Sequence, residues 1–279
     1  MNLFQRAAAP LAISRNNLGP LAELAGNWVG HGYNMIAVPD HQNHKPFRLI
    51  VNATKETLAF TPIGGPVPNR GSLQNDIDIF GLTYLQQVND AATDEGIHIE
   101  PGIWLHVPAT SDPKKPATIV RQSTIPHGDS LLAGGESSCE KRAPHIAPAS
   151  TEPHRVDGKP LPFGYTDPYQ NGKFPPGFDM KNPNQALVDV LQYQQQQLEL
   201  KVVETINLKV STNDAGGITN IPFIVKNANA THMDAIFWIE TVQRPDGSQF
   251  MQLQYTQTVL LVFEEIVWPH VSVATLLKR

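Results

Sequence analysis

Apolar and polar residues alternate most regularly near the C-terminus, from Met251 to Leu261. One face of an extended chain there would carry mainly apolar residues, namely Met251, Leu253, Tyr255, Gln257, Val259 and Leu261, and the other Gln252, Gln254, Thr256 and Thr258. A period of two predicts a strand with one face in a core. Because proline cannot donate to a β-ladder, Trp268-Pro269 predicts a bend, after which His270 opens a second β-branched segment, Val271 to Leu276.

Strand patterns also recur through the rest of the chain. They cover residues 26–36, 47–60, 77–88, 97–107, 118–125, 202–211, 221–225 and 233–242. Pro101-Gly102 is expected to interrupt one of them, and turn residues such as Arg244 to Ser248 separate others. No helical pattern between neighbouring strands is long enough for a crossover, so the sequence predicts antiparallel pairing.

One segment departs from this pattern. Residues 133–182 are rich in Pro, Gly and Ser and poor in apolar residues, and Pro183 then marks a helix start for Gln185 to Leu198. We interpret residues 133–200 as an insertion within one domain, 1–279. A short helix near Pro20 to Ala25 ends the N-terminal arm. The predicted fold is all-β: an antiparallel barrel of nine or ten strands with a proline-rich insertion and one helix.

Composition excludes several classes of protein. The net charge is -5 with 17% charged residues and no basic stripe, which excludes an electrostatic nucleic-acid binder. Cys139 is the single cysteine, so an internal disulfide and a multi-cysteine metal site are excluded. No apolar run is long enough to span a bilayer, and the N-terminus lacks the apolar core of a signal peptide. These features predict a cytoplasmic protein; whether it forms a homo-oligomer stays open.

Two short segments resemble a known family. Residues 24–32 contain Gly26, Trp28, Gly30 and Gly32 in a Gly-x-Trp-x-Gly-x-Gly string, and His270 precedes alternating β-formers and the basic pair at 278–279. Together they resemble the nitrobindins, fatty-acid-binding-protein-like barrels of the calycin type. Lipocalins share a glycine and a tryptophan in a comparable first strand, so the first segment alone indicates only a calycin. The long middle of the chain has no counterpart in that family.

The resemblance implies a haem protein. His270 would be the proximal haem ligand, Trp28 would belong to the cofactor-binding strand, and His106 or His127 would shape the distal side. It also implies chemistry on peroxides or nitrogen oxides. Two alternatives stay open: a cofactor-free carrier of a lipid or other apolar ligand, and a barrel isomerase or cyclase in which Glu100 and a histidine transfer protons. Whether the protein is an enzyme is therefore undecided.

Other chemistry has weaker support. His98, Glu100 and His106 share one parity, and two imidazoles with a carboxylate suit iron, manganese or zinc. The same pattern also fits a strand whose polar side faces solvent. A Gly-x-Ser-x-Gly elbow is absent from the sequence, and nothing near Cys139 clearly activates its thiol.

Overall fold

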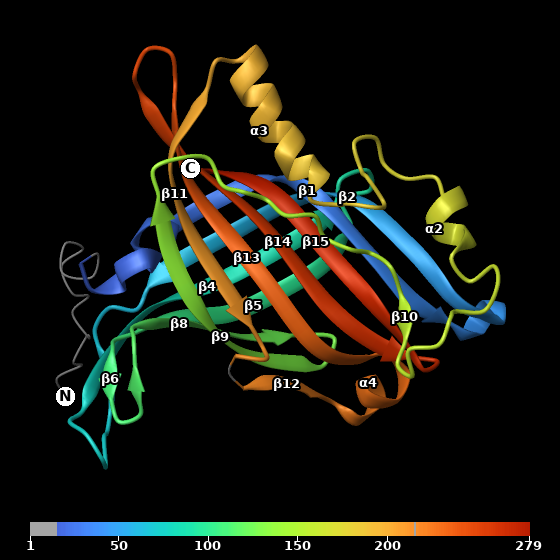
Figure 1. The fold of residues 1–279 in the computed structure, drawn as a ribbon, viewed down its shortest axis with the longest axis horizontal. Coiled ribbons are helices and arrows are strands. Elements are labelled where there is room, and N and C mark those ends of the chain that lie inside the picture. Colours follow the sequence, from blue (N-terminus) through green and yellow to red (C-terminus); the bar gives the residue numbers. More distant parts are fainter. Residues whose placement is uncertain (1–15, 215) are drawn as a thin grey trace, which may run out of the picture.

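A computed structural model describes residues 16–214 and 216–279. Ten antiparallel strands close into a barrel, and the first strand pairs with the last (Figure 1). Around the barrel these are β1 (Gly26–Asp40), β2 (Lys45–Pro62), β4 (Ile77–Asp90), β5 (Gly96–Val107), β8 (Thr118–Ile125), β9 (Asp129–Glu140), β11 (Lys201–Ser211), β13 (Asn229–Gln243), β14 (Gln249–Phe263) and β15 (Ile266–Lys278). The prediction of an all-β antiparallel barrel is confirmed.

Shorter elements decorate this barrel. The short strands are β3 (Val67–Asn69), β6 (Thr110–Ser111), β7 (Lys114–Lys115), β10 (His154–Arg155) and β12 (Gly217–Asn220). The helices are η1 (Gly19–Leu24), η2 (His41–Asn43), α2 (Asp167–Asn171), α3 (Gln185–Gln197) and α4 (Pro222–Asn227). The predicted long helix is confirmed as α3. Of the helices in the described ranges, none has the length and apolar character needed to cross a membrane.

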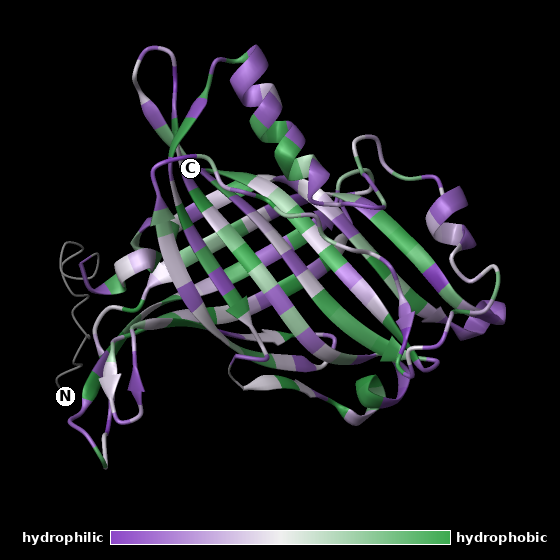
Figure 2. Cartoon of the chain, viewed as in Figure 1, coloured by the Kyte–Doolittle hydropathy of each residue, from purple (hydrophilic) through white to green (hydrophobic). Residues whose placement is uncertain are grey.

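The alternation along β14 separates the inside of the barrel from the outside. Leu253 and Tyr255 belong to the core that fills the barrel, and Tyr255 stands opposite Phe237 of β13. Gln252 and Gln254 have the opposite parity and face outward, where Gln254 Nε2 donates to the Leu187 carbonyl oxygen of α3 at 3.1 Å. Figure 2 shows the same alternation of hydrophobic and hydrophilic residues along the front strands.

One end of the barrel is plugged by the segment before β1. Leu18, Leu21 and Leu24 are buried in the same core as Trp28. The Trp28 indole donates from Nε1 to the Leu24 carbonyl oxygen at 2.7 Å, which fixes η1 against the first strand. Burying each leucine contributes about 1.5–3 kcal/mol. The predicted short helix is thereby confirmed, while residues 1–15 of the arm lie outside the described residues.

The segment between β9 and β11 covers one outer face of the barrel (Figure 1). It contributes Tyr169, Met180 and Leu187 to a second apolar core, which also includes Trp238 and Val273 of the barrel wall. The wall is therefore apolar on both faces here, as expected for strands covered on both sides.

This insertion begins later than predicted. Residues 133–140 belong to β9, which pairs with β8 on one side and β11 on the other, so the insertion starts after Glu140. The strand is rich in Gly and Ser and carries little β-propensity of its own. Glycine is required at Gly135, because a Cβ there would lie 1.8 Å from the Lys209 carbonyl oxygen.

The predicted bend at Trp268-Pro269 is wrong. The chain turns instead at Glu264 and Glu265, whose φ angles are 52° and 57°, and Pro269 lies inside β15 opposite Leu260. β15 pairs with β1 only from Val271 onward. At Pro269, the edge of β15 that faces β1 is therefore not hydrogen-bonded to β1. A residue that cannot donate a hydrogen bond is tolerated at such a position.

Two further predictions need correction. Residues 221–225 are not a strand: β12 ends at Asn220, and α4 begins with Pro222, whose fixed φ suits a first helical position. Pro101-Gly102 does not interrupt β5. Pro101 stands opposite Leu85 of β4, and pairing with β8 starts only at Gly102, so the proline lies beyond the second ladder.

Candidate functional site

Polar side chains gather inside the barrel, midway between its ends. They have the parity of the core residues on β2, β4, β5, β8 and β14. The set is Thr54, Glu56, Tyr84, Gln86, Glu100, Arg121, Tyr255 and Gln257. Burying polar and charged groups is unfavourable unless they are hydrogen-bonded, so their bonding determines what this cluster can do.

Arg121 and Glu100 form a buried ion pair at the centre. Arg121 Nη2 lies 2.7 Å from Glu100 Oε1, and the side chains are 1% and 0% exposed. Arg121 also donates from Nε to the Tyr84 oxygen at 3.0 Å and from Nη1 to Gln257 Oε1 at 2.6 Å. The Tyr84 hydroxyl donates to Glu100 Oε1. Gly102 makes room for this ring, since a Cβ there would lie 2.4 Å from Tyr84 Cε1.

Both members of this pair are ionised. Burial by itself raises the pKa of Glu100, but the Arg121 charge and the hydrogen bonds from His98 and Tyr84 outweigh it and hold that pKa well below its usual range. For Arg121, burial lowers the pKa, but the charges and hydrogen bonds of Glu100 and Tyr84 together outweigh burial and raise it. The guanidinium also lies 5.4 Å from the centre of the Phe237 ring, a cation–π distance.

A second carboxyl group, Glu56, lies in the same interior. It accepts hydrogen bonds from the Tyr255 hydroxyl at 2.6 Å, Thr54 Oγ1 at 2.8 Å and Gln86 Nε2 at 3.4 Å. Burial raises the pKa of Glu56, and these donors only partly offset that effect. The two carboxyl groups therefore differ: Glu100 is held as an anion, whereas Glu56 is shifted towards its neutral form.

Three histidines lie beyond this cluster, and we call this region the histidine end: His98, His127 and His270. His98 Nε2 is 3.3 Å from Glu100 Oε2, and its ring stacks on His127 with centroids 6.2 Å apart. His127 is exposed, and His98 and His270 are partly exposed. The histidine end is therefore open to solvent, in contrast to the end plugged by η1.

His270 is held in one orientation by β1. Its Nε2 lies 2.7 Å from Asn34 Oδ1, which also accepts a hydrogen bond from Ser272 Oγ at 2.9 Å. Because a carboxamide oxygen only accepts, Nε2 carries the proton and Nδ1 carries the lone pair. Burial, together with the charges of His98 and His127, lowers the pKa of His270 to about 3, so the imidazole is neutral at pH 7.

Apolar side chains surround His270 on the inner wall. Val259 of β14 stands directly opposite His270, and Met233 of β13 stands opposite Val259. Ile36 and Ile50 face each other across β1 and β2. Ile36, Ile50 and Val259 are only partly buried, so the histidine end offers apolar surface that a bound molecule would cover.

Two polar atoms in this region have no hydrogen-bond partner among the described residues. They are Ser123 Oγ and Asp129 Oδ1. Ser123 is inward-facing on β8 opposite Gly102, and Asp129 follows the turn that carries His127. Buried polar groups are normally paired, so such atoms mark places where a ligand or water completes the bonding.

The residues predicted from sequence divide between the two ends of the barrel. His270 and His127 come together at the histidine end. His106 lies at the plugged end, with Nδ1 3.1 Å from the Asn17 carbonyl oxygen, and Trp28 lies in the core beside η1. His98 and His106 are near opposite ends of β5, roughly 25 Å apart at the rise of a strand. His106 and Trp28 are therefore separated from His270.

The metal triad that the sequence left open does not form. Within residues 16–214 and 216–279, no group of three or more His, Cys, Asp or Glu residues is arranged to hold a metal ion. His98 and Glu100 do share a face with His106, but that face is the inside of the barrel and not a solvated outer side.

Sequence reasoning missed Arg121, Tyr84, Glu56 and Asn34. The available signal was the alternation of the strand. Arg121 is two residues after the apolar Ile119 in a predicted strand, so both side chains lie on the face that packs into the core. An arginine at such a position needs a buried anion, and Glu100 supplies it.

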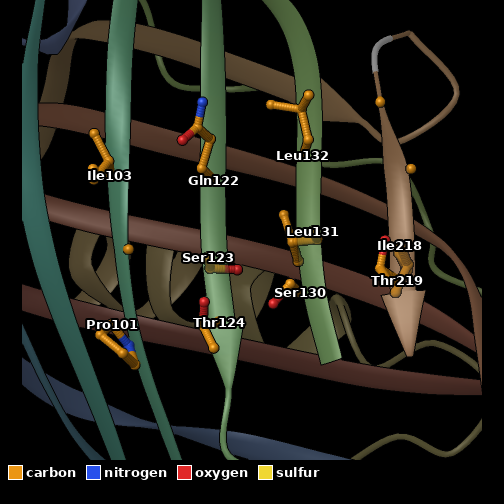
Figure 3. Close-up of a pocket in the computed structure, with 13 residues that line it drawn as sticks. Pro101, Ile103, Gln122, Ser123, Thr124, Ser130, Leu131, Leu132, Ile218 and Thr219 are labelled. Atoms are coloured by element: carbon orange, nitrogen blue, oxygen red, sulfur yellow. The ribbon is translucent and has the colours of Figure 1, made fainter. Parts of the chain in front are cut away.

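A separate hollow lies on the wall of β5, β8, β9 and β12, with a volume of ≈ 690 Å³ (Figure 3). Pro101, Gln122, Thr124, Ser130 and Leu132 are exposed there, which places it on the outer face. None of its lining residues is titratable.

The fold and this interior define a closed antiparallel barrel with one solvent-open, histidine-lined end. No protein-family model and no curated protein matches the chain. One similar solved structure is the crystal structure of Rv2717c from M. tuberculosis, which is 16% identical, with a TM-score of 0.47 over 94% of this chain and 97% of that chain. A likeness at that level carries no argument about function.

Proposed function

We propose that the protein binds a small, largely apolar molecule at the histidine end of its barrel, and that haem held by His270 is the first candidate. The observation that carries the proposal is a neutral imidazole set among partly exposed apolar residues on the inner wall. Apolar pockets with a few well-placed polar groups are typical of cofactor and ligand sites.

The residues around His270 fit a single axial ligand. A ligating histidine commonly donates its second ring N–H to a fixed acceptor, and Asn34 Oδ1 supplies that acceptor. With Nε2 donating to Asn34, the lone pair is on Nδ1, so Nδ1 would be the ligating atom. Bound haem would supply redox chemistry on peroxides or nitrogen oxides.

A cofactor-free carrier of an apolar ligand is the second candidate. The partly exposed Ile36, Ile50 and Val259 favour it, because they would be covered by any apolar molecule. In that case His270 and Asn34 contribute only a polar contact that orients the ligand.

A hemin titration followed by absorption spectroscopy tests the first candidate. Wild type is compared with His270→Ala and with His232→Ala, a control on the outer face of β13 whose side chain is 17% exposed. We expect a saturable Soret band in wild type and in His232→Ala, and its loss or displacement in His270→Ala. Absence of a saturable band in wild type would refute haem binding. Identical spectra for wild type and His270→Ala would refute the role of His270.

Native mass spectrometry of the purified protein tests the second candidate. A co-purified apolar molecule that is lost in an Ile36→Asp/Ile50→Asp variant would support a carrier. A protein that binds neither hemin nor a lipid added to it would contradict both candidates.

A further inference from the structure

A carboxylate–imidazole pair runs from the core of the barrel to its open end. Tyr84 and Arg121 both engage Oε1 of Glu100, which leaves Oε2 for His98 Nε2 at 3.3 Å. Because Glu100 is ionised and only accepts, Nε2 of His98 carries the proton and Nδ1 carries the lone pair. A buried carboxylate that fixes the tautomer of an imidazole in this way prepares it to act as a base.

Exposure separates the roles of the two groups. The Glu100 side chain is 0% exposed, whereas that of His98 is 23% exposed. A molecule in the open end can therefore reach the imidazole but not the carboxylate. Arg121 keeps Glu100 charged, so the carboxylate can stabilise a positive charge that develops on His98.

The surroundings restrict what His98 can act on. His270 is neutral, and the wall offers partly exposed Ile36, Ile50 and Val259. Ser123 Oγ, buried on the neighbouring strand β8, has no partner among the described residues and can bond a polar atom of a ligand. An uncharged, mainly apolar molecule with one polar atom suits this combination.

We propose that His98 is a general base, positioned by Glu100, that removes a proton from carbon in a small uncharged molecule bound at the histidine end. Nδ1 of His98 takes the proton, and the electron pair of the broken C–H bond stays on the molecule. The imidazolium pairs with Glu100 until the proton returns to the same molecule at another position. The result is an isomerisation, which needs no oxidant, reductant or co-reactant, and the step does not depend on haem.

The chain contains a matched control pair. His232 Nε2 lies 2.8 Å from Asp234 Oδ2, with the same spacing along a strand, but Asp234 is 60% exposed and the pair is on the outer face of the barrel. If any histidine–carboxylate pair were sufficient for proton abstraction, His98 and His232 would contribute equally to the rate. If the barrel interior is required, only His98 will contribute.

The test uses 5-nitrobenzisoxazole, a neutral apolar probe, with protein free of haem. A base removes the ring C–H proton, the electron pair forms a nitrile, the N–O bond breaks, and the released phenolate is followed by its visible absorption. We expect saturable turnover in wild type and in His232→Ala, and a loss of about 100-fold or more in kcat/KM for both His98→Ala and His98→Gln. Near-UV circular dichroism verifies that each variant is folded.

Glu100→Gln separates positioning from chemistry. The variant is expected to be less stable than wild type, but in its folded form kcat should fall with little change in KM, because the amide no longer stabilises the imidazolium. A wild-type rate no higher than that of free imidazole at equal concentration would overturn the proposal. So would an unchanged rate in folded His98→Ala. A failed hemin titration would leave it standing, since the two experiments probe different histidines.

Discussion

Breaking the buried Arg121–Glu100 pair should be among the most destabilising single changes in this protein. Among the described residues, Glu100 supplies the only negative charge hydrogen-bonded to the guanidinium, and Glu100→Gln removes it; the guanidinium is 1% exposed and cannot reach water. Leaving one member of such a pair uncompensated costs about 3–5 kcal/mol. Because domains are stable by only about 5–15 kcal/mol in total, the loss is a large fraction of that stability.

Replacing both members should cost much less than the sum of the single changes. In Glu100→Gln/Arg121→Met, both charges of the pair are removed from the core, and methionine packs against Trp104 and Phe237, which already surround the guanidinium. Tyr84 and Gln257 each lose a partner, at about 1–3 kcal/mol per unsatisfied group. We expect an interaction free energy of about 2 kcal/mol or more between the two positions.

Urea unfolding at pH 7, followed by tryptophan fluorescence and far-UV circular dichroism, measures these free energies. The exposed pair Lys55–Asp94, with side chains 46% and 74% exposed, is the control, and each alanine variant there should cost less than about 1 kcal/mol. Strictly additive single and double variants at Glu100 and Arg121 would refute the reasoning, as would single variants as stable as wild type.

The same pair sets a pH dependence. The pKa of Glu100 is lower in the folded protein than its usual value of 4.5, so its contribution is present above pH 4.5 and is lost only as the pH falls through the depressed value. Glu100→Gln should lack this loss on acidification.

The remaining predictions concern other sites. Burial raises the pKa of Glu240 to about 8, so this carboxyl group destabilises the fold increasingly as the pH rises from about 5 to above 8. Urea unfolding at pH 9 should therefore show Glu240→Gln to be more stable than wild type. An unchanged pH dependence in that variant would contradict the assignment. Gly135→Ala should cost more than about 3 kcal/mol or prevent folding, because its Cβ would collide with the Lys209 carbonyl oxygen, whereas Gly96→Ala meets nothing within 4 Å and should be tolerated. Equal thermal stability of the two alanine variants would contradict the packing argument.

The barrel was predictable because apolar and polar residues alternate along its strands. The inward set from Leu253 to Val259 was assigned correctly, since one face of each strand is apolar and the turns lack crossover helices. The turn at Glu264 and Glu265 was not, because positive φ angles in two glutamates have no sequence signal. β9 was missed in part, because pairing on both edges stabilises a Gly- and Ser-rich segment that has little propensity of its own.

The interior site was only partly predictable. His270, His127 and Glu100 could be singled out as chemically capable side chains in or near predicted strands. Their partners could not, because Tyr84, Glu100 and Arg121 meet only through the register of β4, β5 and β8. The strand of His98 also looked like one with a solvated polar side, and only the buried cation Arg121 makes an inward carboxylate favourable.

The pairing of β1 with β15 has a consequence for folding during translation. Asn34 and His270, which are bonded to each other, are 236 positions apart in the chain. The barrel cannot close until β15 has left the exit tunnel, so both edges of an otherwise formed sheet stay unpaired until then. Contacts this distant in sequence form slowly. The emerging chain should therefore need chaperone protection until its last strand is available, and shortening that strand should cause aggregation more readily than loss of any internal loop.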